Sequence, residues 1–234
     1  MQIWQADLNL EPAQIHRFEK LLAPDEGERA RRFRFDRDRI HFTVARGILR
    51  QILSPLAGVS PEDLTFGYGD RGKPYLTTGN EGGKLQFNVS HSGGRALYAV
   101  AFERRVGVDL ESFRPVEGWQ LARRFFCDRE SEKLRLESPV ERQTALFFQL
   151  WTAKEAFLKA TGTGLIGLKD VEILWNNSRE IYLSKIAGDS VNNWSLKPLN
   201  LGENWAASVV VEGRNLDIES TPKIWDFHRA FQSS

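Results

Sequence analysis

Near-continuous apolar runs mark the expected strands, and apolar residues at helical spacing mark the expected helices. In the first part of the chain this pattern predicts strands at residues 1–6, 64–68, 85–90 and 96–102, and a helix-rich region over residues 11–57. In the second part it predicts a strand at VGVDL (106–110), helices at 119–125 and 140–160, and later strands in VEILW, EIYLS, WSLKPL and WAASVVV. Because strands and helices show no sustained βαβ alternation, the pattern predicts an α+β fold with mainly antiparallel sheets packed with helices.

The chain is long enough for two units. Its 234 residues suit one large domain or two small ones, and an apolar content of 41% is ample for a packed core. Since both parts combine helices with sequential strands, we expect two similar α+β subdomains related by a pseudo-two-fold, residues 1–104 and 105–234. The join near residues 103–105 is expected to be tight. The last residues, from about Ile218, are expected to form a loosely specified tail.

Charge and cysteine content exclude several functions. The formal net charge of +1 gives no overall attraction to nucleic acid or to an anionic membrane. The single cysteine, Cys127, rules out an internal disulfide framework and a cysteine-rich zinc site. The N-terminal residues MQIWQADLNL lack the features of a secretion signal, and no run approaches the ~18 apolar residues of a membrane span. We therefore expect a cytoplasmic protein that binds neither membrane nor nucleic acid.

Two carboxylates follow the predicted strand at VGVDLES. If the strand continues through Asp109 and Glu111, both side chains lie on the same face, because side-chain direction reverses at every residue. Two like charges would then be within reach of one cation. The alternative is that they only mark a turn into solvent, which is the commoner use of such residues.

The predicted helix at 140–160 carries three further charges. Lys154 lies inside the apolar stripe, four residues from Leu150, so its ammonium must reach the surface or meet an anion. Glu155 lies at the edge of the stripe, with Lys159 four residues on. An exposed ion pair between these two residues is the simpler interpretation, but the combination favours a semi-buried charged cleft. The GTGLIG run that follows matches a dinucleotide motif only formally, because it comes after a helix; Gly162 instead predicts the end of that helix.

The stretch FNVSHSGG (87–94) combines hydroxyls, an imidazole and glycines. Ser90 and His91 are neighbours on an extended chain and point to opposite sides, so they cannot act as a nucleophile and its base. Anion binding is a better use of these groups, with a polar turn between two strands as the alternative. In the arginine-rich segment 28–50, Arg46 and Arg50 share one helix face and suit a phosphate monoester.

Four motifs together resemble those of a known family. GKP (72–74), FNVSHSGG (87–94), VGVDLE (106–111) and WTAKEAFLKATG (151–162) are similar, in order and spacing, to the motifs of 4′-phosphopantetheinyl transferases of the two-subdomain group. The resemblance implies transfer of the 4′-phosphopantetheine group of coenzyme A to a serine of an apo acyl or peptidyl carrier protein, by a monomer. The serine hydroxyl would attack the β-phosphorus and expel 3′,5′-ADP.

The resemblance also implies roles for individual residues. Mg²⁺, or Mn²⁺ in its place, would be held by Asp109, Glu111 and Glu155 in the second subdomain. The first subdomain would contact the adenine and phosphates of coenzyme A. The residues implied in coenzyme A binding, together with the two arginines inferred from spacing, are Arg46, Arg50, Lys73, Pro74, Ser90, His91, Lys154 and Lys159.

The catalytic group would comprise Glu155, Lys159 and His91. Glu155 is the first candidate for the base that accepts the serine proton, and His91 the second. One departure from the family is visible, because Glu26 and Arg29 stand near its usual basic pair; the 3′-phosphate would then rely on Arg29, Arg46 or His41. A nucleic-acid binder and a catalytically silent scaffold are the alternatives; interleaved acidic residues oppose the first, and the retained carboxylates and Lys159 oppose the second.

Overall fold

The same order of elements occurs in both halves of the chain. The structure is a computed structural model that describes residues 1–79, 81–214 and 216–231. The first half contains β1 (Gln2–Asp7), α1 (Pro12–Glu19), α2 (Pro24–Arg31), α3 (Asp36–Ala57), β2 (Phe66–Tyr68), β3 (Pro74–Leu76), β4 (Leu85–Ser92) and β5 (Arg95–Phe102). The second contains β6 (Val106–Ser112), α4 (Gly118–Phe125), α5 (Asp128–Arg135), α6 (Val140–Thr161), β7 (Val171–Trp175), β8 (Ile181–Ile186), β9 (Trp194–Pro198) and β10 (Trp205–Glu212). Short 3₁₀ turns lie at Pro61–Asp63, Glu81–Gly83, Leu165–Lys169 and Val191–Asn193.

Sheet order confirms the predicted α+β fold. In the first half β5 pairs antiparallel with β1 and β4, and in the second β10 pairs antiparallel with β6 and β9, so the orders β1-β5-β4 and β6-β10-β9 correspond. Each half also has a short antiparallel hairpin, β2-β3 or β7-β8, and one long helix of 22 residues, α3 or α6.

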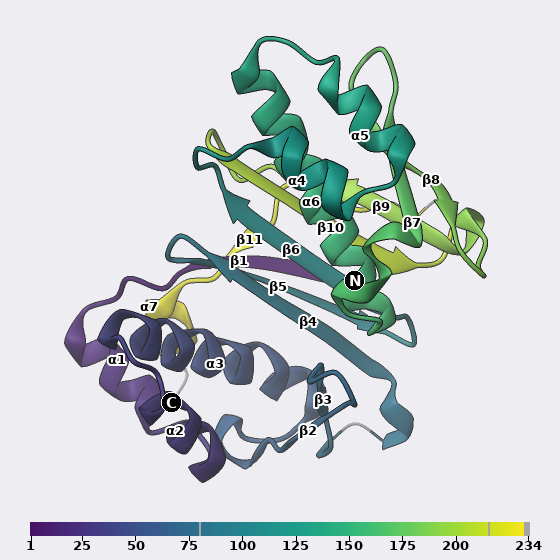
Figure 1. Cartoon of the computed structure of the whole chain (residues 1–234). Helices are drawn as coiled ribbons and strands as arrows, with labels where there is room; N and C mark the ends of the chain where they lie inside the picture. The colour runs from purple at the N-terminus through teal and green to yellow at the C-terminus, as the bar shows by residue number, and fades with distance from the viewer. Residues whose placement is uncertain (80, 215, 232–234) are drawn as a thin grey trace.

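The two sheets pack face to face with helices outside them (Figure 1). Alternate side chains of each central strand go to opposite layers, as strand geometry requires. In β5, Leu97 and Ala99 lie in the core between the sheets, whereas Tyr98 packs toward α3. In β10, Val209 lies between the sheets and Val210 packs toward α6. The protein therefore has three apolar cores: one between each sheet and its helices, and one between the two sheets. The two halves meet where β4 lies beside β6.

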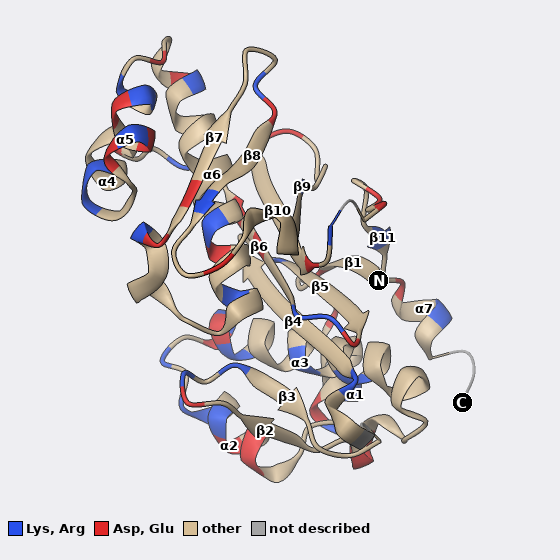
Figure 2. Ribbon diagram, turned by 90° about the vertical axis from the view of Figure 1, so that its right-hand side faces the viewer, with Lys and Arg blue, Asp and Glu red and all other residues tan. Residues whose placement is uncertain are grey.

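The C-terminal segment returns to the first half, so the expectation of a loosely specified tail was wrong. Ile218 is buried between the sheets, and β11 (Lys223–Ile224) adds to the first sheet by pairing parallel with β1. Next to it α7 (Phe227–Ala230) lies near α1 (Figures 1 and 2). Aromatic packing holds this segment in place, because Trp225, Phe227 and Phe231 all contact the ring of Phe18. The division of the chain into two subdomains at residue 104 stays a prediction. Residues 223–231, although they belong to the second part of the sequence, pack against the first half.

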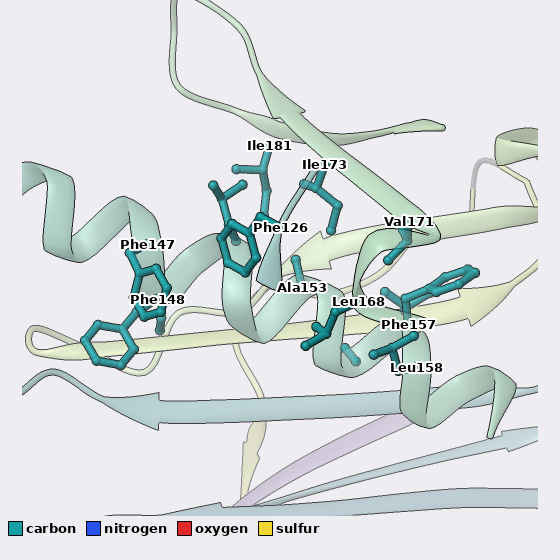
Figure 3. Packing of buried hydrophobic residues seen from close by; sticks show 14 of the residues in the cluster. Phe126, Phe147, Phe148, Ala153, Phe157, Leu158, Leu168, Val171, Ile173 and Ile181 are labelled. Carbon is teal, nitrogen blue, oxygen red and sulfur yellow. The ribbon is translucent and has the colours of Figure 1, made fainter. Parts of the chain in front are cut away.

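The second half has an aromatic core around α6 (Figure 3). Phe126 stacks on Phe147 with ring centroids 5.6 Å apart, and Phe157 meets Trp194 edge to face at 5.1 Å. As predicted, α6 ends at Gly162, whose positive φ of 76° suits glycine. None of the helices in the described ranges is both long enough and apolar enough to cross a bilayer. The core fixes the position of α6, the helix that carries Glu155 and Lys159.

Candidate active site

Two carboxylates of β6 face two serines of β4. The strand continues through Ser112, which confirms that Asp109 and Glu111 share a face and contradicts the simple turn into solvent. Ser90 Oγ donates to Asp109 Oδ1 at 2.7 Å, and Ser92 Oγ donates to Glu111 Oε2 at 3.0 Å. Asp109 is buried, with only 5% of its surface exposed. The β4–β6 join therefore holds two matching hydroxyl–carboxylate pairs.

Lys159 comes to this join from the last turns of α6. Its ammonium donates to Asp109 Oδ1 at 2.6 Å and to Ser90 Oγ at 3.0 Å. The approach of α6 to β6 depends on Gly107, because a Cβ there would lie 2.0 Å from the backbone oxygen of Ala156. Asn88 Oδ1 accepts from the backbone N–H of Val108 at 2.9 Å and ties β4 to β6. Sequence reasoning missed both residues as positioning groups, although each lies within a quoted motif.

The carboxylates alter one another's protonation. Burial, followed by the charges of Asp109 and Glu111 and opposed by Lys159, raises the pKa of Glu155 to about 7. Burial also raises the pKa of Asp109, against the lowering effects of Lys159 and Ser90. Glu155 therefore lies in the field of both β6 carboxylates and can exchange a proton near neutral pH.

The acidic set fits a hard divalent cation. Asp109 Oδ2 is buried and has no hydrogen-bond partner within the described part of the chain, so one oxygen of this carboxylate faces no protein donor. Carboxylate oxygens are the ligands that Mg²⁺ prefers. Among the described residues, however, no three His, Cys, Asp or Glu side chains are already grouped as ligands of one ion. Basic side chains hold two of the carboxylates instead, Lys159 on Asp109 and Arg114 on Glu111.

Pockets lie at the join beside this cluster and on the adjacent part of the first half. One of about 250 Å³ is lined by Glu155, Lys159, Lys73 and Gly72, among others. A second of about 170 Å³ shares Gly72 and is lined by residues from α2, α3, β2, β3 and β4; they include Arg29, Arg46, Tyr68, Pro74 and His91. His41, Arg37 and His91 line a third of about 610 Å³. Although the His91 side chain is open to solvent on one side, burial by the pocket walls and the Lys159 charge lower its pKa, so the imidazole is neutral near pH 7.

Arg46 borders the second pocket, but Arg50 does not reach it. Arg46 pairs with Glu26 at 3.1 Å and donates to the Tyr68 hydroxyl at 2.9 Å. Arg50 is fully buried, pairs with Glu26 at 2.7 Å and donates to the carbonyls of Pro61 (2.7 Å) and Leu64 (2.8 Å). The assignment of Arg50 to a phosphate is therefore corrected. Glu26 is the buried counter-ion of both arginines.

Lys154 is likewise internal. It is fully buried, forms an ion pair with Glu130 of α5 at 2.8 Å and donates to the carbonyls of Leu168 (2.9 Å) and Val171. The expectation that it meets an anion is confirmed, but the anion belongs to the protein, so its predicted place in the coenzyme A cleft is corrected.

Arg50 and Lys154 occupy equivalent places in the two halves. Each lies fourteen residues after the first residue of its 22-residue helix. Each pairs with a glutamate at the third position of the preceding eight-residue helix, Glu26 in α2 or Glu130 in α5. Both glutamates also accept from the backbone N–H at the start of their own helix. These two residues therefore belong to a buried pairing that the fold uses twice.

Lys73 positions the GKP turn. Its ammonium donates to the carbonyls of Lys159 at 2.6 Å, Val106 at 3.2 Å and Ala160 at 3.3 Å. These carbonyls lie at the end of α6 and the start of β6, so the lysine fastens the turn to the second half. Burial, followed by the Arg105 charge, lowers the pKa of Lys73 to about 8. Its neighbour Pro74 lines the 170 Å³ pocket, while the Lys73 ammonium is engaged by the protein.

Comparisons with known proteins define the class. A family model described as "4'-phosphopantetheinyl transferase superfamily" matches residues 105–210, and one described as "4'-phosphopantetheinyl transferase, N-terminal" matches residues 8–103. The chain is 39% identical over 228 residues to the 4'-phosphopantetheinyl transferase HetI of Nostoc sp. (strain PCC 7120), which covers 97% of this chain and 92% of that protein. It is 31% identical to the 4'-phosphopantetheinyl transferase Sfp of Bacillus subtilis (strain 168), over 68% of each chain. The chain therefore belongs to the 4′-phosphopantetheinyl transferase family.

Proposed function

We propose that this protein transfers the 4′-phosphopantetheine group of coenzyme A to a serine of apo carrier proteins and releases 3′,5′-ADP. The observation that carries the proposal is the cluster at the join, where Asp109, Glu111 and Lys159 bond to the serines of β4 and Glu155 lies in the field of all three charges. The cluster lies beside pockets whose walls include Arg46 and His91, which suit phosphate groups. The match over nearly the whole length of the Nostoc enzyme supports the same activity.

The acidic residues would hold the metal. Asp109, Glu111 and Glu155 are the proposed ligands of Mg²⁺, and the unpaired buried oxygen of Asp109 supports that assignment. Bound there, the cation would supply positive charge that offsets the charge of the pyrophosphate.

The chain's own residues would position the reactants and move the proton. Lys159 is proposed to donate to the pyrophosphate while the bond from the β-phosphorus to the 3′,5′-ADP oxygen breaks, the electron pair leaving with that oxygen. The carrier serine oxygen forms the new bond to phosphorus. Glu155 is proposed to accept the serine proton on a carboxylate oxygen, because a pKa of about 7 leaves much of it ionised at neutral pH. His91 is the second candidate, since its lowered pKa keeps the imidazole neutral.

Intact-protein mass spectrometry tests the proposed function. With coenzyme A and Mg²⁺, we expect the mass of an apo carrier to increase by one phosphopantetheine group, because the cluster supplies the charges that this transfer needs. Fatty-acid, polyketide and peptidyl carriers should be tried together, each beside a control in which the acceptor serine is replaced by alanine. Absence of the adduct from every carrier, or its appearance on the alanine controls, would contradict the proposal.

We further propose that the carrier docks on the second half near residues 112–126. Phe113 and Phe125 are partly buried against the α6 core, so the aromatic part of this segment serves packing. Arg123 and Arg124 in the last turn of α4 remain exposed. Exposed arginines on the segment that follows β6 along the chain suit a carrier that is acidic around its serine.

Charge reversal tests this surface. Arg123→Glu with Arg124→Glu is expected to raise the Michaelis constant for the carrier several-fold in low salt and much less in high salt, because the attraction is screened. Titration calorimetry should show unchanged affinity for coenzyme A. The matched control, Arg179→Glu with Lys185→Glu, changes two exposed charges near the β7–β8 hairpin. Equal effects of the two double variants would place the docking surface elsewhere.

A further inference from the structure

Glu111 holds a cation supplied by the chain. Its Oε2 atom accepts from Arg114 Nη1 at 2.8 Å and from Ser92 Oγ at 3.0 Å. The Arg114 guanidinium also lies 5.2 Å from the centroid of the Phe148 ring. The carboxylate side chain is 21% exposed and the arginine side chain 55% exposed. The ion pair therefore lies at the mouth of the acidic cluster, with its positive member on the solvent side.

Each of the two carboxylates of β6 accepts hydrogen bonds from one serine and one basic side chain. Asp109 has Ser90 and Lys159, and Glu111 has Ser92 and Arg114. The cations differ in exposure and in the element that carries them: Lys159 extends from α6 and is 29% exposed, whereas Arg114 is 55% exposed and lies in the irregular segment between β6 and α4. Releasing Arg114 requires rotation of one half-exposed side chain, which costs little because an exposed ion pair is weak. Of these two pairs, the Glu111 pair is the one that can open easily.

We propose that Arg114 is a displaceable counter-ion of Glu111, which competes with the divalent cation and is released toward solvent when that cation binds. This inference rests on the metal ligands of the proposed function. An arginine and a divalent cation repel each other when they share one carboxylate, so the presence of Arg114 weakens metal binding. The same charge keeps the cluster neutralised when the metal is absent.

The release of Arg114 couples the metal to an acidic partner. Arg114 precedes α4 along the chain, on the segment proposed to dock the carrier. A guanidinium freed from Glu111 adds one positive charge to that surface. By thermodynamic linkage, an acidic partner that captures Arg114 strengthens metal binding, and the metal strengthens partner binding by the same factor.

Titration of the protein with Mn²⁺ alone tests the competition. Binding is followed by water-proton relaxation, which needs neither coenzyme A nor a carrier. Arg114→Ala is expected to lower the Mn²⁺ dissociation constant about threefold to tenfold, as for loss of one competing ion pair of modest strength. The matched control is Arg135→Ala, which removes an arginine paired three residues away with Glu132 at 3.1 Å on α5. The control is expected to leave the constant unchanged.

A double-variant cycle assigns the effect to Glu111. In a Glu111→Gln background, Arg114→Ala is expected to change the Mn²⁺ constant by less than twofold, because the shared carboxylate is gone. The proposal is overturned if Arg114→Ala leaves Mn²⁺ affinity unchanged or weaker, if Arg135→Ala gives the same gain, or if the gain persists without Glu111. Absence of saturable Mn²⁺ binding to every variant also overturns it. Failure of the proposed function is seen separately, as absence of the carrier adduct in mass spectrometry.

Discussion

Replacing Glu155 with glutamine is expected to lower transfer at least a hundredfold and to stabilise the metal-free protein above pH 7. The loss of transfer follows from removal of a proposed metal ligand that is also the proposed base. The gain in stability follows from the pKa of Glu155, which folding raises from its ordinary value of 4.5 to about 7. Between these values the folded chain binds more protons than the unfolded chain, so its stability falls as pH rises through that window. Glutamine has no charge to bury and avoids the loss.

Chemical denaturation in the presence of a chelator measures the effect. At pH 8 we expect the free energy of unfolding of Glu155→Gln to exceed that of the parent by roughly 1–2 kcal/mol, after allowance for solvent screening of a partly exposed group. At pH 4.5 and below the two should converge. Asp109→Asn is the contrast: burial raises the pKa of Asp109 as well, but this substitution also takes the charged partner from Lys159, so it should lose transfer and gain less stability than Glu155→Gln. A Glu155→Gln protein that keeps its turnover, or is less stable at pH 8, would show that the assignment is wrong.

Replacing Lys154 with methionine is expected to destabilise the protein by about 3–5 kcal/mol, the usual cost of leaving a buried charge without its partner. Glu130 would keep its two backbone donors, Ile173 N at 2.6 Å and Cys127 N at 2.8 Å, but lose its cation. The carbonyls of Leu168 and Val171 would lose their donor as well. Adding Glu130→Gln removes the uncompensated charge and keeps an oxygen for one of the two backbone donors, so the double variant should recover part of the loss.

Denaturation curves compare these variants with Lys169→Met, which removes an exposed lysine near the same segment. The control should change stability by less than about 0.5 kcal/mol. The affinity of the folded protein for coenzyme A should not depend on Lys154, because its ammonium is enclosed by protein groups. A stable Lys154→Met protein with much weaker coenzyme A binding would restore Lys154 to the ligand cleft and contradict its place in the buried pair.

Local pattern was sufficient for part of the site. Strand alternation placed Asp109 and Glu111 on one face, and the structure confirms this because β6 continues to Ser112. Glycine at the end of a helical pattern located the end of α6 at Gly162. The absence of βαβ alternation indicated antiparallel sheets, which both halves contain. Each of these features depends on residues within a few positions of one another, so the sequence specifies it directly.

The partners of the buried cations could not be predicted in this way. Arg46, Arg50 and Lys154 are all basic residues on apolar helix faces, and nothing in their own helices distinguishes a pocket from an internal carboxylate. The distinction comes from how α2 and α5 dock, because these helices bring Glu26 to Arg50 and Glu130 to Lys154. The tail was misjudged for a similar reason, since its aromatic residues find Phe18 only after the whole chain has folded.

The sequence alone thus determined the strands and helices, the shared face of the carboxylates and the resemblance to a transferase family, because these depend on local periodicity and on short motifs in a fixed order. The tertiary structure decided which charges face the pockets, which neutralise one another inside the protein and which pair at the mouth of the cluster. Those outcomes depend on distances between residues far apart in the chain. Arg114, three residues beyond Glu111, shows the limit at short range, because its contact also requires the packing of Phe148 of α6 beneath the guanidinium.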